Sequence, residues 1–486
     1  MILYKKIFYI SILCLAVFIA ADDQTVIVTL LPSMVLDLRI SIGELNKISW
    51  TITSYLLGFT IIMPIAGKIC DKYGYRSTLI FSLIIFSLGS LLIGITNSIP
   101  ENSYFPSKLM WMIIFRFLQA MGGGAIIPIC IVGVSLILEK KYWIYGFGLI
   151  GASAELGGVI GPLWGSLIVE YFDWETAFLI NIPISLLIIF LMYFLPKSRI
   201  ADTRIKIFDI VIFSVIITLS TYLISEYNGI DFSALVIILA LLVLSSLFLI
   251  RILKKQQNFI PNELFDYKSF LTSSFIHFFV GASLIVIMVT IPLSASTIHQ
   301  MDNLEIGLSL LNLTLFIGVG SILGIFISKL SNFIALIISG CICSFGIFLY
   351  SLNISKPPDE LFFILMIIGL GFGIYIVPIH NAGLNKIPEK IRGISSSMIS
   401  FSRMIGMIFG LSIMTTFGTA RFSELVSGIQ IFTSNTSDQQ EMIESINLAG
   451  LSVFEELIFG ALIFSLLALF ITILSFYYTD TTDATA

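Results

Sequence analysis

Fourteen separate stretches of predominantly apolar residues run through this 486-residue chain. Each is close to the roughly 20 residues that a helix needs to cross the hydrocarbon core of a bilayer. Apolar residues make up 57% of the chain and charged residues only 12%, against about 25% charged in an ordinary soluble domain. These proportions exclude a soluble enzyme, a nucleic-acid-binding protein and a disordered chain, and they predict an all-α membrane protein. The stretches cover approximately residues 8–32, 48–68, 78–97, 109–133, 143–168, 176–195, 207–225, 232–252, 270–293, 306–328, 332–351, 360–382, 394–418 and 457–477.

The first apolar stretch follows Lys5 and Lys6, as the apolar part of a signal peptide would. However, its apolar character resumes after Asp22 and Asp23 and continues to Leu31, which makes it long enough to span. We therefore interpret it as a first membrane helix that carries two acids.

Lysine and arginine predict the orientation, because cytoplasmic loops carry an excess of both. With the N-terminus in the cytoplasm, nineteen of the 26 basic residues fall on the cytoplasmic side and five outside. The other two, Arg116 and Arg403, fall within spans. The bias persists to the end of the chain, so the sequence predicts fourteen helices with both termini in the cytoplasm. The polar segment 419–456 is then expected to be an outside loop.

Five charged residues lie where a bilayer disfavours them: Asp22 and Asp23 in the first span, Arg116 in the fourth, Glu155 in the fifth and Arg403 in the thirteenth. Each costs about 3 kcal/mol or more at the membrane centre unless it faces a partner or a wet cavity. They are either structural ion pairs or groups along a transport path. A carboxyl group in water-poor surroundings favours its neutral form and can exchange a proton near neutral pH.

Neither the histidines nor the cysteines indicate a further site. His277 and His380 are expected to be hydrogen-bonded packing residues, and the five cysteines have no metal-ligand or disulfide context. The chain also lacks the phosphate-binding pattern G-x-x-x-x-G-K-[ST], which argues against transport driven by ATP. No cofactor, metal or nucleic-acid partner is predicted.

The segment between the second and third spans contains Gly67, Asp71, Gly74 and Arg76. It resembles the loop motif G-x-L-A-D-R-x-G-R-[KR] of the major facilitator superfamily, with Tyr75 where the family has arginine. The glycines allow a tight turn at the membrane face. The resemblance implies that this loop takes part in conformational change.

The fourth span contains Arg116 and Gln119, three residues apart and therefore on one helix face, followed by three glycines. This pattern resembles the superfamily motif R-x-x-Q-G, with Ala120 in place of its glycine. The resemblance implies that Arg116 takes part in proton coupling.

The fifth span resembles the antiporter motif G-x8-G-x3-GP-x2-GG of the same superfamily, which accompanies antiport and usually drug efflux. Glu155 lies inside the motif, where a small or apolar residue is expected, and Ser166 replaces the last glycine. The matching positions are Gly148, Gly157, Gly161, Pro162 and Gly165.

Further matches extend the resemblance along the chain. Residues 23–32 are similar to the family's first-span motif, and residues 174–183 to its W-R-W-x-F-x-I-N-x-P pattern, with Glu175 in place of the arginine. Residues 388–410, which include Arg403, resemble the pattern P-x-x-x-R-G…R-x-x-G…G. The chain thus resembles the 14-helix drug:proton antiporters of the major facilitator superfamily.

This resemblance implies two six-helix bundles, at residues 1–200 and 261–486, with two inserted transmembrane helices at 201–260. The substrate site would lie between the bundles near the midplane. The implied function is a proton-coupled antiporter that exports lipophilic, cationic drugs or toxic compounds across the cytoplasmic membrane. Its expected partners are a small-molecule substrate, protons and the bilayer, and the expected state is a monomer.

Two alternatives stay open: an exporter of one specific metabolite or lipid and, more remotely, a membrane sensor that transports nothing. An enzyme is not indicated, because no nucleophile–base pair or metal cluster is evident. The candidate proton-coupling or substrate residues are Asp23, Asp22, Glu155, Arg116 and Gln119. The candidate conformational residues are the motif residues named above and Arg403.

Overall fold

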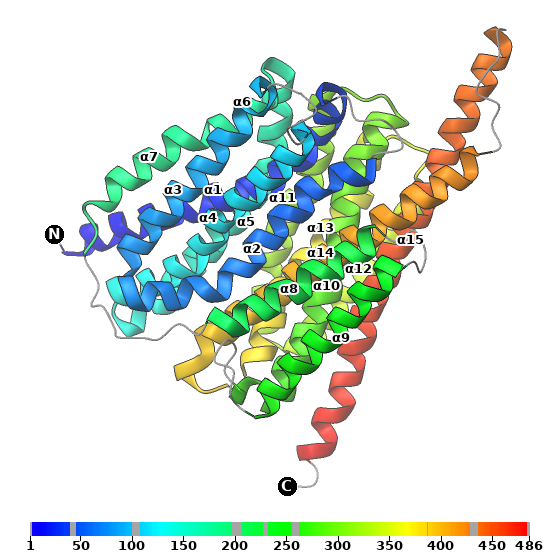
Figure 1. The fold of residues 1–486 in the computed structure, drawn as a ribbon. Coiled ribbons are helices and arrows are strands. Elements are labelled where there is room, and N and C mark those ends of the chain that lie inside the picture. The colour runs from blue at the N-terminus through cyan, green and yellow to red at the C-terminus, as the bar shows by residue number, and fades with distance from the viewer. Residues whose placement is uncertain are drawn as a thin grey trace.

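The computed structural model describes residues 2–38, 45–99, 107–196, 207–226, 232–254, 262–385, 387–427 and 436–483 (Figure 1). Within these residues every regular element is helical, and fourteen helical segments are long and apolar enough to cross a membrane. The predicted all-α membrane fold is therefore confirmed.

The first half of the chain forms one group of helices. α1 packs against α5, and α4 packs against both α2 and α3. Two short helices, α6 and α7, follow one another and together make the sixth span. The bounds are α1 (Ile2–Asp37), α2 (Leu45–Tyr73), α3 (Tyr75–Gly94), α4 (Lys108–Ile137), α5 (Trp143–Tyr171), α6 (Glu175–Leu179) and α7 (Asn181–Met192), with 3-10 turns at Thr96–Ser98 and Lys140–Tyr142.

The last part of the chain forms a second group, in which α13 packs against α11 and α12, and α10 packs against α14 and α15. The bounds are α10 (Lys268–Thr297), α11 (Asn303–Ser328), α12 (Asn332–Ser351), α13 (Phe362–Leu384), α14 (Glu389–Val426) and α15 (Thr436–Asp483), with 3-10 turns at Asn262–Asp266 and Pro358–Leu361.

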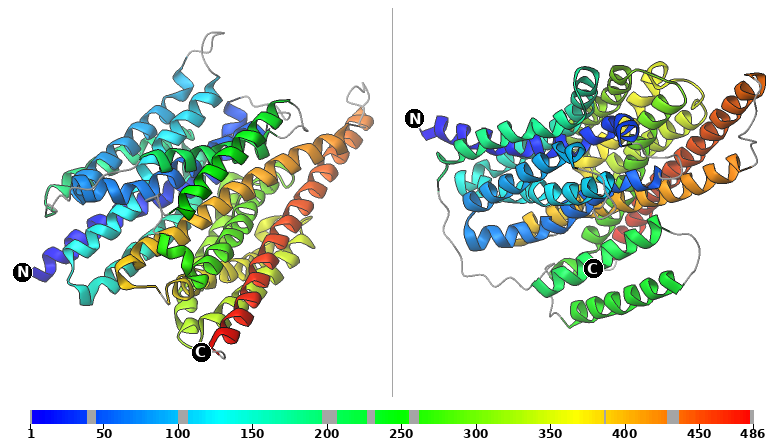
Figure 2. Two further views of the ribbon diagram at one scale, coloured as in Figure 1. Left: turned by 60° about the horizontal axis from the view of Figure 1, so that its bottom comes forward. Right: turned by 45° about the horizontal axis from the view of Figure 1, so that its top comes forward.

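Between these groups in sequence lie α8 (Ile207–Ser225) and α9 (Phe232–Leu253), which Figure 2 shows at the side of the other helices. α8 packs against α9, α14 and α2, and an ion pair between Arg251 and Asp209 joins α9 to α8. No residue in the apolar window of α9 is buried. The bundle and insertion boundaries taken from the family resemblance stay a prediction about the organisation of the chain.

The two groups meet along α5 and α11, and along α2 and α14. At one end of this junction Gly307 of α11 lies against Ser166 of α5. Further along, the hydroxyl of Thr314 donates to the backbone carbonyl of Val159 at 3.2 Å. Beyond that point a Cβ added at Gly148 or Gly151 would meet no atom within 4 Å, although Gly146 still packs against Val134 of α4. The two groups are therefore in contact where Gly307 meets Ser166, and at the other end of α5 the face that carries Gly148 and Gly151 is open.

The polar segment 419–456, expected to be an outside loop, is helical on both sides of residues 428–435. α14 continues to Val426 and α15 begins at Thr436, and Figure 1 shows this pair projecting past the neighbouring helices. Arg421 pairs with Glu424 at 2.7 Å and with Glu456 of α15 at 3.1 Å. The change to polar composition therefore does not coincide with the ends of these helices.

Candidate functional site

Asp23 of α1 forms the centre of a buried polar cluster in the first half of the chain. Its Oδ2 accepts a hydrogen bond from Nη1 of Arg116 at 2.9 Å. Its Oδ1 accepts from the side-chain amides of Gln119 and Asn181, both at 2.8 Å. Three donors from α4 and α7 thus satisfy one carboxylate, and the Asp23 and Arg116 side chains have no exposed surface.

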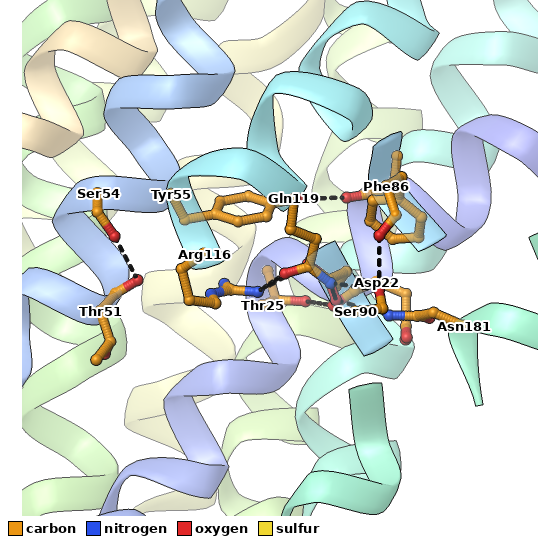
Figure 3. A network of polar contacts seen from close by, with 12 residues as sticks. Asp22, Thr25, Thr51, Ser54, Tyr55, Phe86, Ser90, Arg116, Gln119 and Asn181 are labelled. Carbon is orange, nitrogen blue, oxygen red and sulfur yellow. Dashed lines mark hydrogen bonds and ion pairs between the residues drawn. The ribbon is translucent and has the colours of Figure 1, made fainter. Parts of the chain in front are cut away.

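The same cluster holds Arg116 in place from several sides (Figure 3). Its guanidinium lies 4.0 Å from the centre of the Tyr55 ring and 5.3 Å from that of Phe178, within reach of cation–π attraction. Nη1 also donates to Gln119 at 2.6 Å, and Gln119 donates to Ser90 of α3 at 2.8 Å. Side chains from six helices therefore converge on one enclosed ion pair.

A separate cavity of about 110 Å³ lies at the junction of the two halves. Its walls come from α1, α4 and α5 on one side and from α10, α11, α13 and α14 on the other. Most of the lining is apolar, and it includes Met288, Met404 and Met407. Methionine side chains are flexible and polarizable, so such a wall can adapt to ligands of different shape.

Glu155 and Arg403 bring opposite charges to opposite walls of this cavity. Glu155 projects from α5 and Arg403 from α14. Within the part of the chain that the structure describes, no carboxylate oxygen lies within 4.0 Å of the Arg403 guanidinium nitrogens, and its buried Nε has no hydrogen-bond partner. The two charges are therefore available to a ligand, or to each other if the halves move closer.

The three acids of the candidate set thus lie in three different settings. Asp23 is sealed with Arg116, whereas Glu155 lines the cavity. Asp22 is half-buried on α1 and is not among the residues that line this cavity, and its Oδ1 is buried without a hydrogen-bond partner. The sequence alone could not predict which of the three acids is enclosed, which lines the cavity and which is half-buried.

The glycines of the fifth-span motif explain how α5 approaches α1. A Cβ at Gly157 would lie 2.4 Å from the carbonyl oxygen of Phe18, and one at Gly161 would lie 2.2 Å from the Thr25 hydroxyl. Gly165 is equally close to Thr29. This packing fixes the rotation of α5 and turns Glu155 toward the cavity. Pro162 lies inside the helix between these contacts, and Gly148 lies in open space.

The loop motif joins α2 to α3 through a single residue, Gly74, whose φ of 83° is rarely adopted by any other residue. Tyr75, which replaces the family arginine, is buried and donates to the carbonyl of Pro196 at 2.7 Å. Arg76 donates to the carbonyl of Leu195 at 3.1 Å. The motif therefore holds the end of the sixth span. A Cβ at Gly67 would meet no atom, and the Asp71 side chain lies outside the described part.

The histidines were expected only to pack, but the structure brings two of them together. The ring centroids of His277 and His380 are 5.4 Å apart, and His277 lines the cavity with Arg403. Asn181 and Ser90, which complete the Asp23 cluster, were likewise not predicted as site residues. Intramembrane position was the only available signal for the histidines, and it does not reveal which helices become neighbours.

Residues 13–411 match the sequence model of the family described as Major Facilitator Superfamily. Multidrug resistance protein 3 of Bacillus subtilis (strain 168) is 28% identical over 427 residues, which cover 85% of this chain and 79% of the relative. The multidrug transporter protein MdtP of the same organism is 29% identical over 440 residues, covering 87% and 77%. A protein of Mycobacterium tuberculosis (strain ATCC 25618 / H37Rv) named a triacylglyceride transporter is 27% identical over 446 residues, covering 85% and 83%.

Two solved structures share the fold at low sequence identity. A bacterial homologue of the human lysosomal transporter Spinster aligns with a TM-score of 0.67 at 13% identity, covering 96% of this chain and 95% of that one. A D-xylose–proton symporter aligns with a TM-score of 0.64 at 15% identity, covering 92% and 97%.

Proposed function

The chain belongs to the major facilitator superfamily and is a transporter rather than an enzyme, and from this starting point we propose that it exports lipophilic cations in exchange for protons. Relatives named as multidrug transporters support this proposal. The observation that carries it is the cavity between the halves, where a single carboxylate, Glu155, lies among apolar and methionine side chains.

A carboxylate in such a cavity can serve a cation and a proton in turn. The ionised form of Glu155 attracts a lipophilic cation, whose apolar body fills the adaptable wall. The protonated form does not attract the cation, so proton and substrate compete for one site and their binding is reciprocally coupled. Asp23 is expected to act differently, because its carboxylate is already occupied by three donors.

The orientation follows from the charge bias and is part of the proposal. With both termini in the cytoplasm of a cell membrane, Ser166 and Gly307 lie at the outer end of the junction. The open face of α5 at Gly148 and Gly151 then lies toward the cytoplasm, the side from which a substrate for export would enter. Reporter enzymes fused to either terminus test this placement. Reporter activity on the outer side of the membrane would contradict a cytoplasmic terminus.

The function is tested with everted membrane vesicles that hold a proton gradient reported by a pH-sensitive dye. We expect tetraphenylphosphonium and other unrelated lipophilic cations to release protons from vesicles with the native chain. Glu155→Gln is expected to abolish this release. Glu170→Gln is the matched control, since Glu170 lies on the same helix but is exposed.

Either of two results would change the assignment. Proton release by Glu155→Gln at the native rate would place the coupling acid elsewhere. No release with any cation, from protein shown to be folded, would exclude the multidrug function.

Lipid export is the second candidate, and two observations favour it. A relative that covers 85% of this chain is named a triacylglyceride transporter, and the cavity is mostly apolar. Reconstituted protein would then move a fluorescent triacylglycerol between membranes without any effect of tetraphenylphosphonium. Competition between the two compounds would instead show that they share one site.

A further inference from the structure

Two histidines that this mechanism leaves unused lie side by side in the second half. His277 of α10 and His380 of α13 face each other edge to face, with ring planes at 85°. The His277 side chain is only 2% exposed. Ionisable residues at membrane depth are costly and are functional candidates by default, so the pair requires a physical account.

Hydrogen bonds identify the nitrogen of each ring that can take up a proton. Nδ1 of His277 lies 3.0 Å from the carbonyl of Ile399, and Nδ1 of His380 lies 2.9 Å from that of Ile376. A carbonyl oxygen only accepts, so each Nδ1 carries the hydrogen. Nε2 is therefore the site that gains or loses a proton. In His380 this nitrogen contacts the hydroxyl of Ser400 at 3.1 Å.

Charged and titratable groups on α5, α13 and α14 surround the pair. Arg403, on α14, lines the same cavity as His277, and Glu155 lies across it on α5. Tyr375, on α13, turns its hydroxyl toward Gly340 of α12. A neighbouring cation opposes protonation of an imidazole, and a nearby carboxylate offsets that cation. The charge state of the pair therefore depends on how far Glu155 is from Arg403.

We propose that His277 and His380 form a second proton-binding site of the transporter, in the half opposite Glu155, whose occupancy is set by the approach of Glu155 to Arg403. This inference rests on the proposed proton-coupled function. While the halves are apart, Arg403 keeps the rings neutral. When ionised Glu155 comes close to Arg403, Nε2 of His277 binds a proton taken from water in the cavity. Separation of the halves returns that proton to water.

Nuclear magnetic resonance of protein labelled with 15N-histidine tests the site directly, because the chain has only three histidines. Single His→Gln variants assign the signals. We expect Glu155→Gln to move the titration midpoint of His277 to lower pH, and Arg403→Gln to move it to higher pH. His299 is the internal control, since it lies outside the cavity and contacts the carbonyl of Ile354.

Shifts of His277 in the same direction for both variants would overturn the proposal. So would a titration midpoint of His277 that neither Glu155→Gln nor Arg403→Gln moves from its value in the native chain. These measurements require no transport, and if His277→Gln misfolds, the His299→Gln and His380→Gln variants assign the His277 signal by elimination.

Counting protons per cation in vesicles tests the consequence for coupling. His277→Gln is expected to exchange fewer protons per tetraphenylphosphonium ion than the native chain, by up to half. His299→Gln is expected to keep the native ratio, and an unchanged ratio in His277→Gln would overturn the proposal. A native chain that exchanges no protons at all would instead refute the proposed function, so the two failures are distinguishable.

Discussion

Gly307 of α11 lies so close to Ser166 of α5 that a Cβ added to the glycine would sit 1.8 Å from the serine hydroxyl oxygen. The serine occupies the position at which the antiporter motif has a glycine. The side chain of Ser166 therefore fills the space that the motif glycine would leave empty on α5. The glycine that allows the two helices to approach closely is instead Gly307, on α11. The closed end of the junction depends on this contact.

Gly307→Ala is expected to reduce the initial rate of export about tenfold or more. Forcing extra atoms into a packed contact costs on the order of 1–3 kcal/mol, and the closed end must re-form in every cycle. Ser166→Gly in the same chain is expected to restore the rate, because it removes the atoms that the new methyl group meets. Gly318→Ala is the control, since a Cβ there would be 3.8 Å from the nearest atom, in Val159. If the export rate of the double variant stays as low as that of Gly307→Ala, the contact between Gly307 and Ser166 does not limit the rate.

Asp23→Asn is expected to destabilise the folded protein, whereas Glu155→Gln is not. Removing one partner of a buried ion pair leaves an uncompensated charge, here on Arg116, at a cost of about 3–5 kcal/mol. Glu155 has no such partner among the described residues. Thermal unfolding in detergent compares the two variants, with Asp22→Asn as the control at the adjacent position. Equal melting temperatures for Asp23→Asn and the native chain would contradict the structural role.

Gly74→Ala is expected to weaken the junction of α2 and α3, because residues with a Cβ rarely adopt its φ of 83° and strain of this kind costs about 1–3 kcal/mol. Gly67→Ala, in the same motif but in open space, is expected to be neutral. Protease cleavage between α2 and α3, followed over time, would report the difference. Equal cleavage of the two variants would show that the turn tolerates a side chain.

The loop between α4 and α5 should respond to acid. Hydrogen bonds from Lys6 and then Lys141 hold the pKa of Glu139 below its usual range. A lowered pKa means that the contact stabilises the fold above the ordinary glutamate value of about 4.3, and that this stability is lost as pH falls through the folded-state pKa. We expect hydrogen exchange at the start of α1 to rise in that window. In Lys6→Gln, hydrogen exchange at the start of α1 should already be faster at pH 7 than in the native chain. If its exchange depended on pH as in the native chain, the role given to the contact between Lys6 and Glu139 would be contradicted.

The sequence predicted the number and place of the membrane helices because apolar length alone determines them. It also placed Arg116 and Gln119 together, since a spacing of three residues puts them on one helix face. It could not distinguish Asp22 from Asp23. Adjacent helical residues point about 100° apart, and a helix that is apolar on all sides gives no signal for its rotation. Packing of the α5 glycines against α1 supplies that rotation.

The convergence of Glu155, Arg403 and His277 could not be predicted for a related reason. These residues lie on three helices far apart in sequence, and only the packing of the two halves brings them to one cavity. A pattern within one helix carries no information about such neighbours. The family resemblance did not supply it either, because Glu155 replaces a small or apolar residue of the motif.

α9 has no buried residue in its apolar window, so in a membrane most of this window is expected to face lipid. Its membrane segment of 19 residues corresponds to about 28 Å of helix, slightly less than the hydrocarbon thickness of a typical bilayer. A thicker membrane would therefore have to thin locally around α9, at a cost of fractions of a kcal/mol per Å. Because α8 packs against α9 and also against α2 and α14, we expect a change in bilayer thickness at α9 to be transmitted to the junction of the two halves.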